Sequence, residues 1–570
     1  MARAGHAYPQ VEATVAALMD SRVVTCASRV SAAGALARAR GAGARFVALD
    51  AGRAVRESEL ARAVQWGLGP RRAREVAWRD LPSLPVGGAE IAARRLLLAG
   101  SSLVLVRRAG RVVGVVDAEA LDLAPPPSSV LARLERVADR PGEARLWLLR
   151  VAGKIGEGMG APAYAVGGFV RDLLRGASAP PTLPPTLPDV DLVVEGDGVA
   201  FARRLAEEIG GTLLVHGSFG TASIEGGRAP AGAGLDAVAL GRVDVASARR
   251  EHYPTAGALP EVAPAGLVED LRRRDFSMNA MAVALGPDRF GHLLDPLGGQ
   301  RDVRGRVVRV LRPLAFVEDP TRIFRAARYA ARLGFRADAA TLAAIRVAVD
   351  RPDYVALSGR RLWHEIELVA AEPRARQAFE LLVRWKATSI WNIGAVSSRG
   401  LIHAERLRRW ATGAGVAVDP AELFLLALSL GRPAAAVGRC LDRLALTGEP
   451  RARIEAGAMA APLAGRLEAR RLRPSEVDEM LAPAPESALL AAWLRGGARA
   501  RRRIQWYLAR GHAVRPRLTG EDLLALGVPR GARVGSALAM LRRYRLDRAV
   551  GSLAEERELV KEWLTSGKEA

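Results

Sequence analysis

Two aspartates separated by one residue are the side chains most clearly placed to do chemistry. They lie in the run Asp189-Val-Asp191, which leads into the apolar run Leu192-Val-Val194. In a strand, residues two apart point to the same side, and adjacent carboxylates repel unless a cation lies between them. Such oxygen ligands suit Mg²⁺, which also holds substrate phosphates. Taken alone, the pair is better explained as a solvated acidic loop, because two aspartates at this spacing are common.

A third acid, Asp244, lies in the alternating run Gly241-Arg-Val-Asp-Val-Ala246. It completes a carboxylate triad if this strand joins the same sheet; the alternative is an acid at a strand edge. In two-metal catalysis one ion lowers the pKa of an attacking hydroxyl, and the other steadies a triphosphate and its leaving pyrophosphate. We therefore take Asp189 and Asp191 as candidate metal ligands, and these two with Asp244 as candidate catalytic residues.

Further polar groups in the same region have the chemistry of a nucleotide site. Gly167 and Gly168 stand between a buried strand and a helix expected over 170–175, where backbone amides can approach a phosphate. The run Glu269-Asp-Leu-Arg-Arg-Arg-Asp-Phe-Ser-Met-Asn-Ala280 brings a cationic cluster to polar groups that can reach a sugar. Asp319 and Arg322 are three apart and share one helical face, so together they offer an acceptor and a donor fork to a base edge. The candidate nucleotide-binding residues in these runs are Gly167, Gly168, Arg171, Arg274, Asp275, Asn279, Asp319 and Arg322.

Different elements must position these groups. Strands expected around Ala163–Val166, Asp189–Val194 and Gly241–Ala246 carry the glycine turn and the carboxylates. A helix opening at Glu318-Asp-Pro-Thr-Arg322 carries the base-facing pair, with Pro320 suited to its first turn. Beyond about Phe335 the chain is Ala- and Leu-rich, Arg-studded and without strand alternation, which predicts a helical remainder.

In this order, the motifs resemble the head and neck of the bacterial class II tRNA nucleotidyltransferase and poly(A) polymerase family, a branch of the polymerase-β-like superfamily. The resemblance covers roughly the segment from Tyr164 to Phe335 and rests on several short runs. They are Gly167-Gly-Phe-Val-Arg171, Asp189-Val-Asp191, Arg273-Arg-Asp-Phe-Ser-Met-Asn279, Leu294-Asp-Pro296 and Glu318-Asp-Pro-Thr-Arg322.

The resemblance implies roles for these positions. Gly168 and Arg171 match the triphosphate-binding turn, and Arg274 matches a triphosphate-contacting arginine. Asp319 and Arg322 match the pair that reads the incoming base without a template, with Arg325 in the same pocket. The implied reaction adds C or A, or both, from CTP or ATP to the tRNA 3′ end, with Mg²⁺. The run Arg249-Arg-Glu-His-Tyr-Pro-Thr-Ala-Gly257 falls where the family has a mobile loop.

Composition agrees with a polyanionic partner. The 570 residues carry 84 Lys and Arg against 61 Asp and Glu, a formal net charge of +23, which points to nucleic acid.

Only two cysteines are present, so neither a disulfide framework nor a cysteine zinc site is available. No apolar run approaches the roughly 20 residues of a membrane span. We expect no membrane association and a cytoplasmic location.

The expected fold class is multidomain, α/β followed by all-α. Residues 1–123 resemble a tandem pair of CBS modules through two similar passes with β runs at Arg45–Leu49 and Leu103–Arg107. Their expected role is packing or self-association rather than nucleotide sensing. Residues 124–159 form a proline-rich linker and connecting helix. The head, with a mixed sheet, then spans 160–310, the neck 311–375, and a tRNA-binding body and tail 376–570.

Two alternatives stay open. Poly(A) polymerases share every motif above, but their usual basic C-terminal extension is not evident here. A non-catalytic RNA-binding scaffold is disfavoured because both Asp189 and Asp191 are retained, together with Arg274. The base-reading pair is common to CCA-, CC- and A-adding enzymes, so the motifs do not distinguish among them.

Overall fold

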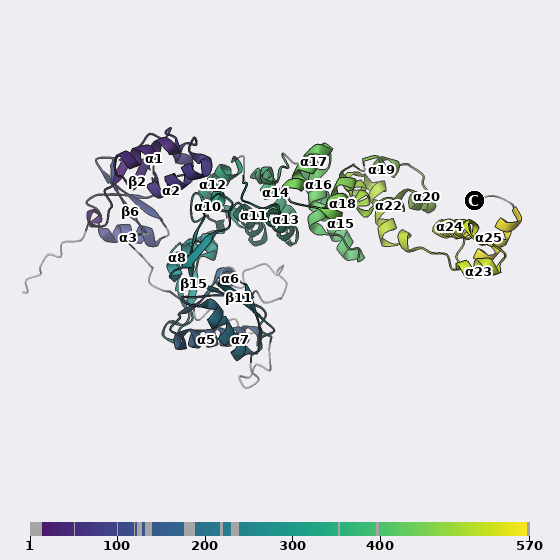
Figure 1. Cartoon of the computed structure of the whole chain (residues 1–570), viewed down its shortest axis with the longest axis horizontal. Coiled ribbons are helices and arrows are strands. Elements are labelled where there is room, and N and C mark those ends of the chain that lie inside the picture. Colours follow the sequence, from purple (N-terminus) through teal and green to yellow (C-terminus); the bar gives the residue numbers. More distant parts are fainter. Residues whose placement is uncertain are drawn as a thin grey trace, which may run out of the picture. The chain divides into compact units, whose positions relative to one another are not determined.

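The computed structural model describes most of the chain as two compact units, residues 1–357 and 358–570 (Figure 1). The described residues are 14–50, 52–99, 101–118, 120–121, 128–130, 140–175, 189–216, 220–229, 239–351, 354–394, 398–459 and 461–566. None of the described helices has the length and apolarity that crossing a bilayer requires.

The N-terminal part of the first unit contains two three-stranded sheets with one topology. In each, the first two strands are parallel and the last two antiparallel. The strands are β1 (Val23–Thr25), β2 (Phe46–Leu49) and β3 (Arg53–Arg56), then β4 (Ser83–Pro85), β5 (Leu103–Arg108) and β6 (Arg111–Asp117). The helices are α1 (Ala32–Gly41), α2 (Glu57–Ala63) and α3 (Glu90–Leu98). Both β runs expected from the sequence are strands. We call residues 14–121 the N-terminal repeat pair.

An eight-stranded mixed sheet forms the middle of this unit, in the order β10-β11-β12-β9-β8-β15-β16-β7. Strands β9 and β12 are parallel, and the other neighbours are antiparallel. The strands are β7 (Ser128–Ser129), β8 (Ala163–Val166), β9 (Val190–Val194), β10 (Thr212–His216), β11 (Thr221–Glu225), β12 (Val243–Ser247), β15 (Ala282–Ala284) and β16 (His292–Leu294). A hairpin of β13 (Arg249–His252) and β14 (Glu261–Pro264) lies outside it.

Strand β7 was not expected, because the sequence predicts only a linker and a connecting helix over 124–159. Ser128 and Ser129 pair with β16 at the edge of the sheet. Pro125 to Pro127 have no amide hydrogen to donate to a ladder, whereas the serines do. A two-residue strand is too short to leave a periodic signal in the sequence.

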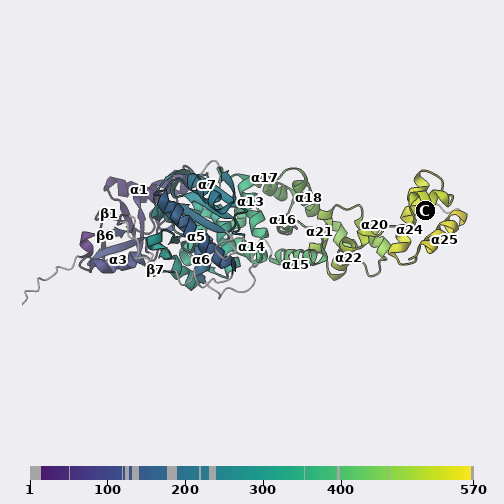
Figure 2. The ribbon, with the colours of Figure 1, turned by 90° about the horizontal axis from the view of Figure 1, so that it is seen from below.

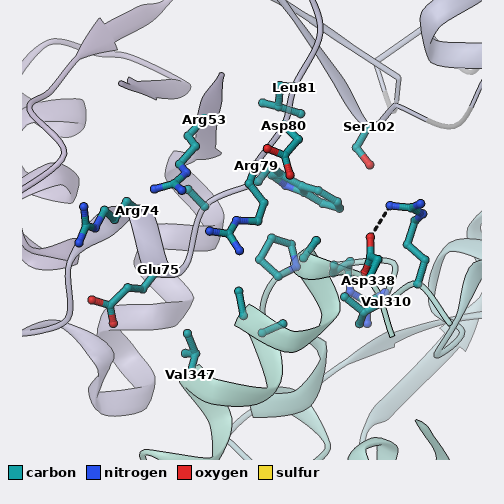
Figure 3. A pocket seen from close by; sticks show the side chains of 18 of the residues that line it. Arg53, Arg74, Glu75, Arg79, Asp80, Leu81, Ser102, Val310, Asp338 and Val347 are labelled. Carbon is teal, nitrogen blue, oxygen red and sulfur yellow. Dashed lines mark hydrogen bonds and ion pairs between the residues drawn. The ribbon is translucent and has the colours of Figure 1, made fainter. Parts of the chain in front are cut away.

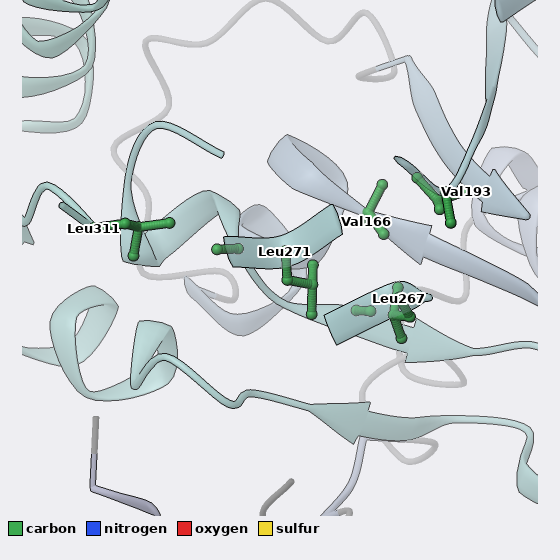
Figure 4. Close-up of a cluster of buried hydrophobic side chains, with 8 residues drawn as sticks. Val166, Val193, Leu267, Leu271 and Leu311 are labelled. Carbon is green, nitrogen blue, oxygen red and sulfur yellow. The ribbon is translucent and has the colours of Figure 1, made fainter. Parts of the chain in front are cut away.

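Helices α5 (Arg140–Gly158) and α7 (Gly198–Ile209) lie side by side against the sheet (Figures 1 and 2). Asp197 begins α7 by accepting hydrogen bonds from the amides of Val199 and Ala200. Helices α6 (Gly167–Arg175), α8 (Leu267–Arg272) and α9 (Gly299–Gly305) complete this part. Between α8 and the strands lies an apolar cluster that includes Val166, Val193, Leu267, Leu271 and Leu311 (Figure 4). This cluster fixes the backbone directly before the glycine turn and before Arg274.

The first unit ends in helices α10 (Ala315–Glu318), α11 (Thr321–Leu333) and α12 (Ala339–Val349), with short strands β17 (Val307–Val308) and β18 (Arg336–Ala337). The α11 helix follows Pro320 and ends at Gly334 in the left-handed conformation. Phe276, from the head, meets the rings of Phe316 and Tyr329 at 6.3 and 5.9 Å. These aromatic contacts hold α10 and α11 against the residues that follow α8.

In the described part of the second unit the regular elements are all helical, as expected from its composition. The helices are α13 (Gly359–Ala370), α14 (Ala375–Arg384), α15 (Ser398–Ala414), α16 (Pro420–Ser429), α17 (Ala434–Arg443), α18 (Gly448–Met459), α19 (Ala461–Arg466), α20 (Pro474–Leu481), α21 (Glu486–Arg495), α22 (Ala498–Ala509), α23 (Gly520–Ala525), α24 (Ala532–Leu546) and α25 (Leu553–Ser566). Phe379 and Phe424 stack at 4.7 Å between α14 and α16. A separate cluster around Leu523, Leu541 and Val560 packs α23 to α25 together.

Candidate active site

The glycine turn lies directly against the second aspartate of the pair. Gly167 begins α6 with φ +69°, a left-handed conformation that side chains other than glycine rarely adopt. A Cβ atom on Gly167 would lie 2.8 Å from Oδ2 of Asp191, which is closer than such atoms approach. The absence of a side chain at Gly167 therefore makes room for the Asp191 carboxylate.

Two of the three predicted carboxylates occupy neighbouring positions of the sheet, and the third directly precedes it. Asp191 on β9 is in register with Asp244 on the parallel strand β12, so both side chains point to one face. Asp189 directly precedes β9 and is exposed, while Asp191 is partly buried. Burial raises the pKa of Asp191; Arg274 opposes this shift, and the negative charges of Asp244 and Asp189 add to it.

Asp244 has partners of its own. Its Oδ1 accepts hydrogen bonds from Ser223 Oγ at 2.6 Å and from Arg242 Nε at 2.9 Å. Among the residues that the structure describes, no group of three or more His, Cys, Asp or Glu side chains has converged into a set that could hold a metal ion.

The donor chemistry at the turn nevertheless fits a divalent cation. Asp189 and Asp191 supply hard oxygen ligands, and Mg²⁺ is held in proteins by one or two carboxylates together with substrate phosphates and water. The raised pKa of Asp191 reflects unrelieved burial and negative charge, which a bound cation would offset.

Arg171 is buried and tied into a polar network below the turn. Its guanidinium donates to Asn279 Oδ1 at 2.9 Å and pairs with both oxygens of Asp172 at 3.0 and 2.7 Å. The guanidinium also lies over the ring of Tyr329, 5.5 Å from its centre. The structure therefore brings Arg171 and Asn279, predicted from separate motifs, into contact.

Asp275 continues this network toward α11. Arg325 Nε donates to Asp275 Oδ2 at 2.8 Å, and Asn279 Nδ2 donates to Oδ1 at 3.3 Å. Burial alone would raise the pKa of Asp275, but the Arg325 guanidinium outweighs it, so the pKa is lowered. Arg325 and Arg171 both lie over the Tyr329 ring, Arg325 at 5.6 Å. Asp275 is therefore a charged group that anchors α11 to the head.

Arg274 is oriented by a fully buried acid. Its Nε and Nη2 donate to Asp270 Oδ2 at 3.2 and 3.0 Å, while Arg273 binds Oδ1 of the same side chain. A Cβ atom on Gly167 would lie 3.6 Å from Arg274 Nη1. The Arg274 guanidinium therefore reaches from Asp270 to the glycine turn, where its positive charge opposes the rise in the pKa of Asp191.

The predicted base-facing pair lies at the start of α11. Asp319 Oδ1 accepts hydrogen bonds from the amide and hydroxyl of Thr321 at 3.1 and 2.7 Å. The buried Arg322 donates through Nη2 to Tyr253 Oη at 3.1 Å and to the Arg273 carbonyl at 3.2 Å. Its Nη1 is buried without a hydrogen-bond partner among the described residues.

Glu318 holds Arg322 from behind and links three parts of the first unit. Its carboxylate is 1% exposed and lies 3.6 Å from Arg322 Nη1 and 2.5 Å from Arg312 Nη2. A third arginine, Arg62, comes from α2 of the N-terminal repeat pair, with Nη1 3.3 Å from Glu318 Oε1. Although burial opposes the effect, these positive charges lower the pKa of Glu318.

The sequence did not single out several residues that organise the site. Asp270 and Glu318 stand inside quoted motifs, and their position beside arginines was the available signal. Tyr253, whose ring lies 5.7 Å from the Arg322 guanidinium, stands in the run expected to be a mobile loop. Nothing in the local sequence around Arg62 indicates its contact with Glu318.

Comparisons with known proteins place this arrangement in a family. The model of the poly A polymerase head domain matches residues 163–309. The chain is 35% identical over 407 residues to the CC-adding tRNA nucleotidyltransferase of Deinococcus radiodurans, covering 71% of this chain and 90% of that relative. The chain belongs to the tRNA nucleotidyltransferase family. It is also 33% identical over 434 residues to the A-adding tRNA nucleotidyltransferase of Geobacter sulfurreducens, covering 73% of this chain.

Coverage of family members differs among the matches. The chain spans 46% of the Geobacter relative's length, less than half. A solved structure of the Thermotoga maritima CCA-adding enzyme complexed with tRNA matches with a TM-score of 0.62 and 26% identity, over 77% of this chain and 100% of that chain. The expected combination of a mixed α/β head and a long helical region is therefore confirmed.

Proposed function

We propose that this protein is a tRNA nucleotidyltransferase that adds C or A, or both, to the tRNA 3′ end from CTP or ATP and releases pyrophosphate. The observation that carries the proposal is the close approach of the Asp191 carboxylate to Gly167, with Arg274 beside both. A carboxylate, a phosphate-binding turn and a fixed guanidinium are the parts that nucleotidyl transfer needs.

In this proposal Asp189 and Asp191 hold the divalent metal, most simply Mg²⁺, with Asp244 as a third catalytic carboxylate. Bound there, the metal would activate the terminal 3′-hydroxyl of tRNA and neutralise triphosphate charge. Arg274 contacts the triphosphate, and Asp270 keeps its guanidinium extended toward the turn. Gly167 and Gly168 let the backbone approach the phosphates, and Arg171 adds positive charge below them.

Base selection is assigned to the start of α11. Arg322 keeps one buried Nη1 without a hydrogen-bond partner among the described residues, and Asp319 supplies an acceptor three residues earlier. Such a donor and acceptor can match the polar edge of C or A without a template strand. Arg325, Asp275 and Asn279 keep this helix attached to the head and complete the nucleotide pocket.

The remaining parts of the chain have supporting roles in the proposal. The helical second unit binds tRNA by its shape and backbone phosphates, as its basic composition favours. The N-terminal repeat pair is CBS-like and serves packing or self-association, which its repeated topology supports. The domain boundaries are those given above, and the protein acts in the cytoplasm. A poly(A) polymerase activity is less well supported, since the relatives quoted are named for tRNA.

Incorporation of labelled ATP and labelled CTP, with Mg²⁺, into tRNAs ending before CCA, at C and at CC tests the proposal. AMP added only to the CC-ended tRNA means an A-adding enzyme, and CMP without AMP means a CC-adding enzyme. Both in turn mean a complete CCA enzyme. Asp189→Ala is the control. If neither this variant nor the wild type incorporates nucleotide into any of the tRNAs, the proposal is contradicted.

A further inference from the structure

A large pocket lies in the first unit, between the N-terminal repeat pair and the neck (Figure 3). Its volume is about 900 Å³, in the range of small-molecule sites. Arg53, Arg74 and Arg79 project into it from the repeat pair, opposite Val310 and Val347 (Figure 3). None of the residues proposed above for catalysis or nucleotide binding lines it, so it is separate from the candidate active site.

Positive charge dominates the pocket wall. Eight arginines and four acidic residues line it. Three of the four acids lie beside particular arginines: Asp338 pairs with Arg309, and Asp350 and Glu75 lie 3.3 and 3.4 Å from Arg71. Arg309 is bound to Asp302 as well. Within each pair the positive and negative charges cancel, so the net charge of the pocket wall comes from the other arginines.

Three of the other lining arginines, Arg53, Arg74 and Arg79, have no ion pair with any residue that the structure describes. The side chains of Arg53 and Arg74 make no hydrogen bond with any residue that the structure describes. Within the part of the chain that the structure describes, the Arg79 guanidinium donates to the Ala339 carbonyl alone, at 3.1 Å, and a carbonyl does not compensate its charge. All three are half-buried rather than fully solvated. Half-buried, unpaired guanidinium groups facing one cavity repel one another and favour an anion between them.

The pocket also has an aromatic wall. Trp78 lines it and is half-buried. Its indole N–H donates to both oxygens of Glu59 at 3.1 Å, so the ring has a fixed orientation. An aromatic face beside several guanidinium groups can accept a flat ring attached to phosphate.

We propose that this pocket binds a polyphosphate anion, the chemistry shared by a nucleoside triphosphate and by inorganic pyrophosphate. Guanidinium forks bind phosphate oxygens in pairs, and the volume accommodates either ligand. Bound there, the anion bridges the repeat pair and the neck, because its arginines come from both. The inference stands independently of the reaction proposed for the carboxylate site.

Isothermal titration of the full-length protein with pyrophosphate and, separately, with ATP tests this, without added metal. We expect Arg53→Gln/Arg74→Gln to weaken binding of at least one of these ligands tenfold or more. The matched control is Arg108→Gln/Arg111→Gln, which removes the same charge from exposed positions of the repeat pair outside the pocket. Arg274→Gln identifies any binding that belongs to the active site.

Thermal melting of each variant establishes that it is folded, and nucleotide incorporation by Arg53→Gln/Arg74→Gln is expected to persist. ATP binding much more tightly than pyrophosphate at this site means that the ring is recognised, and equal affinity means that phosphate alone is; both support the proposal. Unchanged affinity in Arg53→Gln/Arg74→Gln, or equal weakening in the control pair, overturns it. Weakened tRNA binding with unchanged pyrophosphate and ATP binding overturns it too, and assigns these arginines to the RNA backbone.

Discussion

Replacing Gly167 by Ala adds one methyl group at the place where the glycine turn meets the carboxylate. The change has two separate costs. The first is backbone strain, because Gly167 has φ +69° and an L side chain in the left-handed region costs about 1–2 kcal/mol. The second is displacement of Asp191, since the new Cβ would lie 2.8 Å from Oδ2 and the carboxylate must move.

The two costs lead to different measurable losses. The strain lowers the melting temperature by roughly 2–8 °C, at about 2–4 °C per kcal/mol for a domain of this size class. Displacement of a reacting group by about 1 Å costs on the order of 100-fold in rate. Because the required shift here is smaller, we expect the single-turnover rate of nucleotide incorporation to fall about 10- to 100-fold.

Gly160→Ala is the matched control. Gly160 has φ +63°, and a Cβ atom there would meet nothing within 4 Å. It carries the same backbone strain without touching the site, so its melting temperature falls similarly while its rate is retained. If Gly167→Ala and Gly160→Ala incorporate nucleotide at the same rate, the packing of Asp191 against the turn does not matter for the reaction, and the reasoning is refuted.

Three further predictions follow from the charges around the site. The pKa of Asp191 is raised by burial, so its contribution to the stability of the metal-free protein falls as pH rises from the unfolded pKa through the folded one. Asp191→Asn should therefore raise the melting temperature at neutral pH, abolish nucleotide incorporation and reduce the stabilisation by Mg²⁺. A lower melting temperature of this variant would contradict the prediction. Arg322→Lys keeps the charge but loses the planar fork that donates to Tyr253 and the Arg273 carbonyl. Loss of hydrogen bonds to a charged group costs about 1.5–3 kcal/mol, so the preference for the correct nucleotide over GTP and UTP should fall about 10- to 100-fold in competition assays. Arg62→Gln removes one of the three positive charges that surround buried Glu318. Because Arg62 is partly exposed, the effect is at most about 1 kcal/mol, or roughly a fivefold rise in KM for the nucleotide. Arg40→Gln, which breaks an exposed pair with Glu57, should leave KM unchanged, and equal effects of the two variants would refute a connection between Arg62 and the nucleotide site.

Features governed by local sequence could be predicted. Strand alternation around Asp189-Val-Asp191 and around Asp244 was enough to expect Asp191 and Asp244 on one face of the sheet. The register of β9 and β12 aligns these two residues. Gly167 and Gly168 were expected at a strand-to-helix turn, and they follow β8 directly. The helix α6 begins at Gly167 itself, earlier than the residue 170 expected. In each case the relevant contacts lie between neighbouring strands or within one turn.

Features that depend on long-range packing could not be predicted. Arg62 and Glu318 are 256 positions apart, and their contact requires the docking of two separately folded parts. Asp244 was expected as a third catalytic carboxylate, and its hydrogen bonds with Arg242 and Ser223 depend on side-chain rotamers that strand alternation does not specify. Arg171 likewise meets Asn279 only because α6 packs against the segment after α8.

The central claim is that the carboxylates at the glycine turn carry out metal-dependent nucleotide addition to tRNA. The most direct measurement is single-turnover extension of tRNAs ending before CCA and at CC by the wild type and by Asp191→Asn, with labelled ATP and CTP over a range of Mg²⁺ concentrations. We predict Mg²⁺-dependent extension of at least one tRNA by the wild type and none by the folded variant. Extension by Asp191→Asn at the wild-type rate, or extension that does not depend on a divalent cation, would contradict the account.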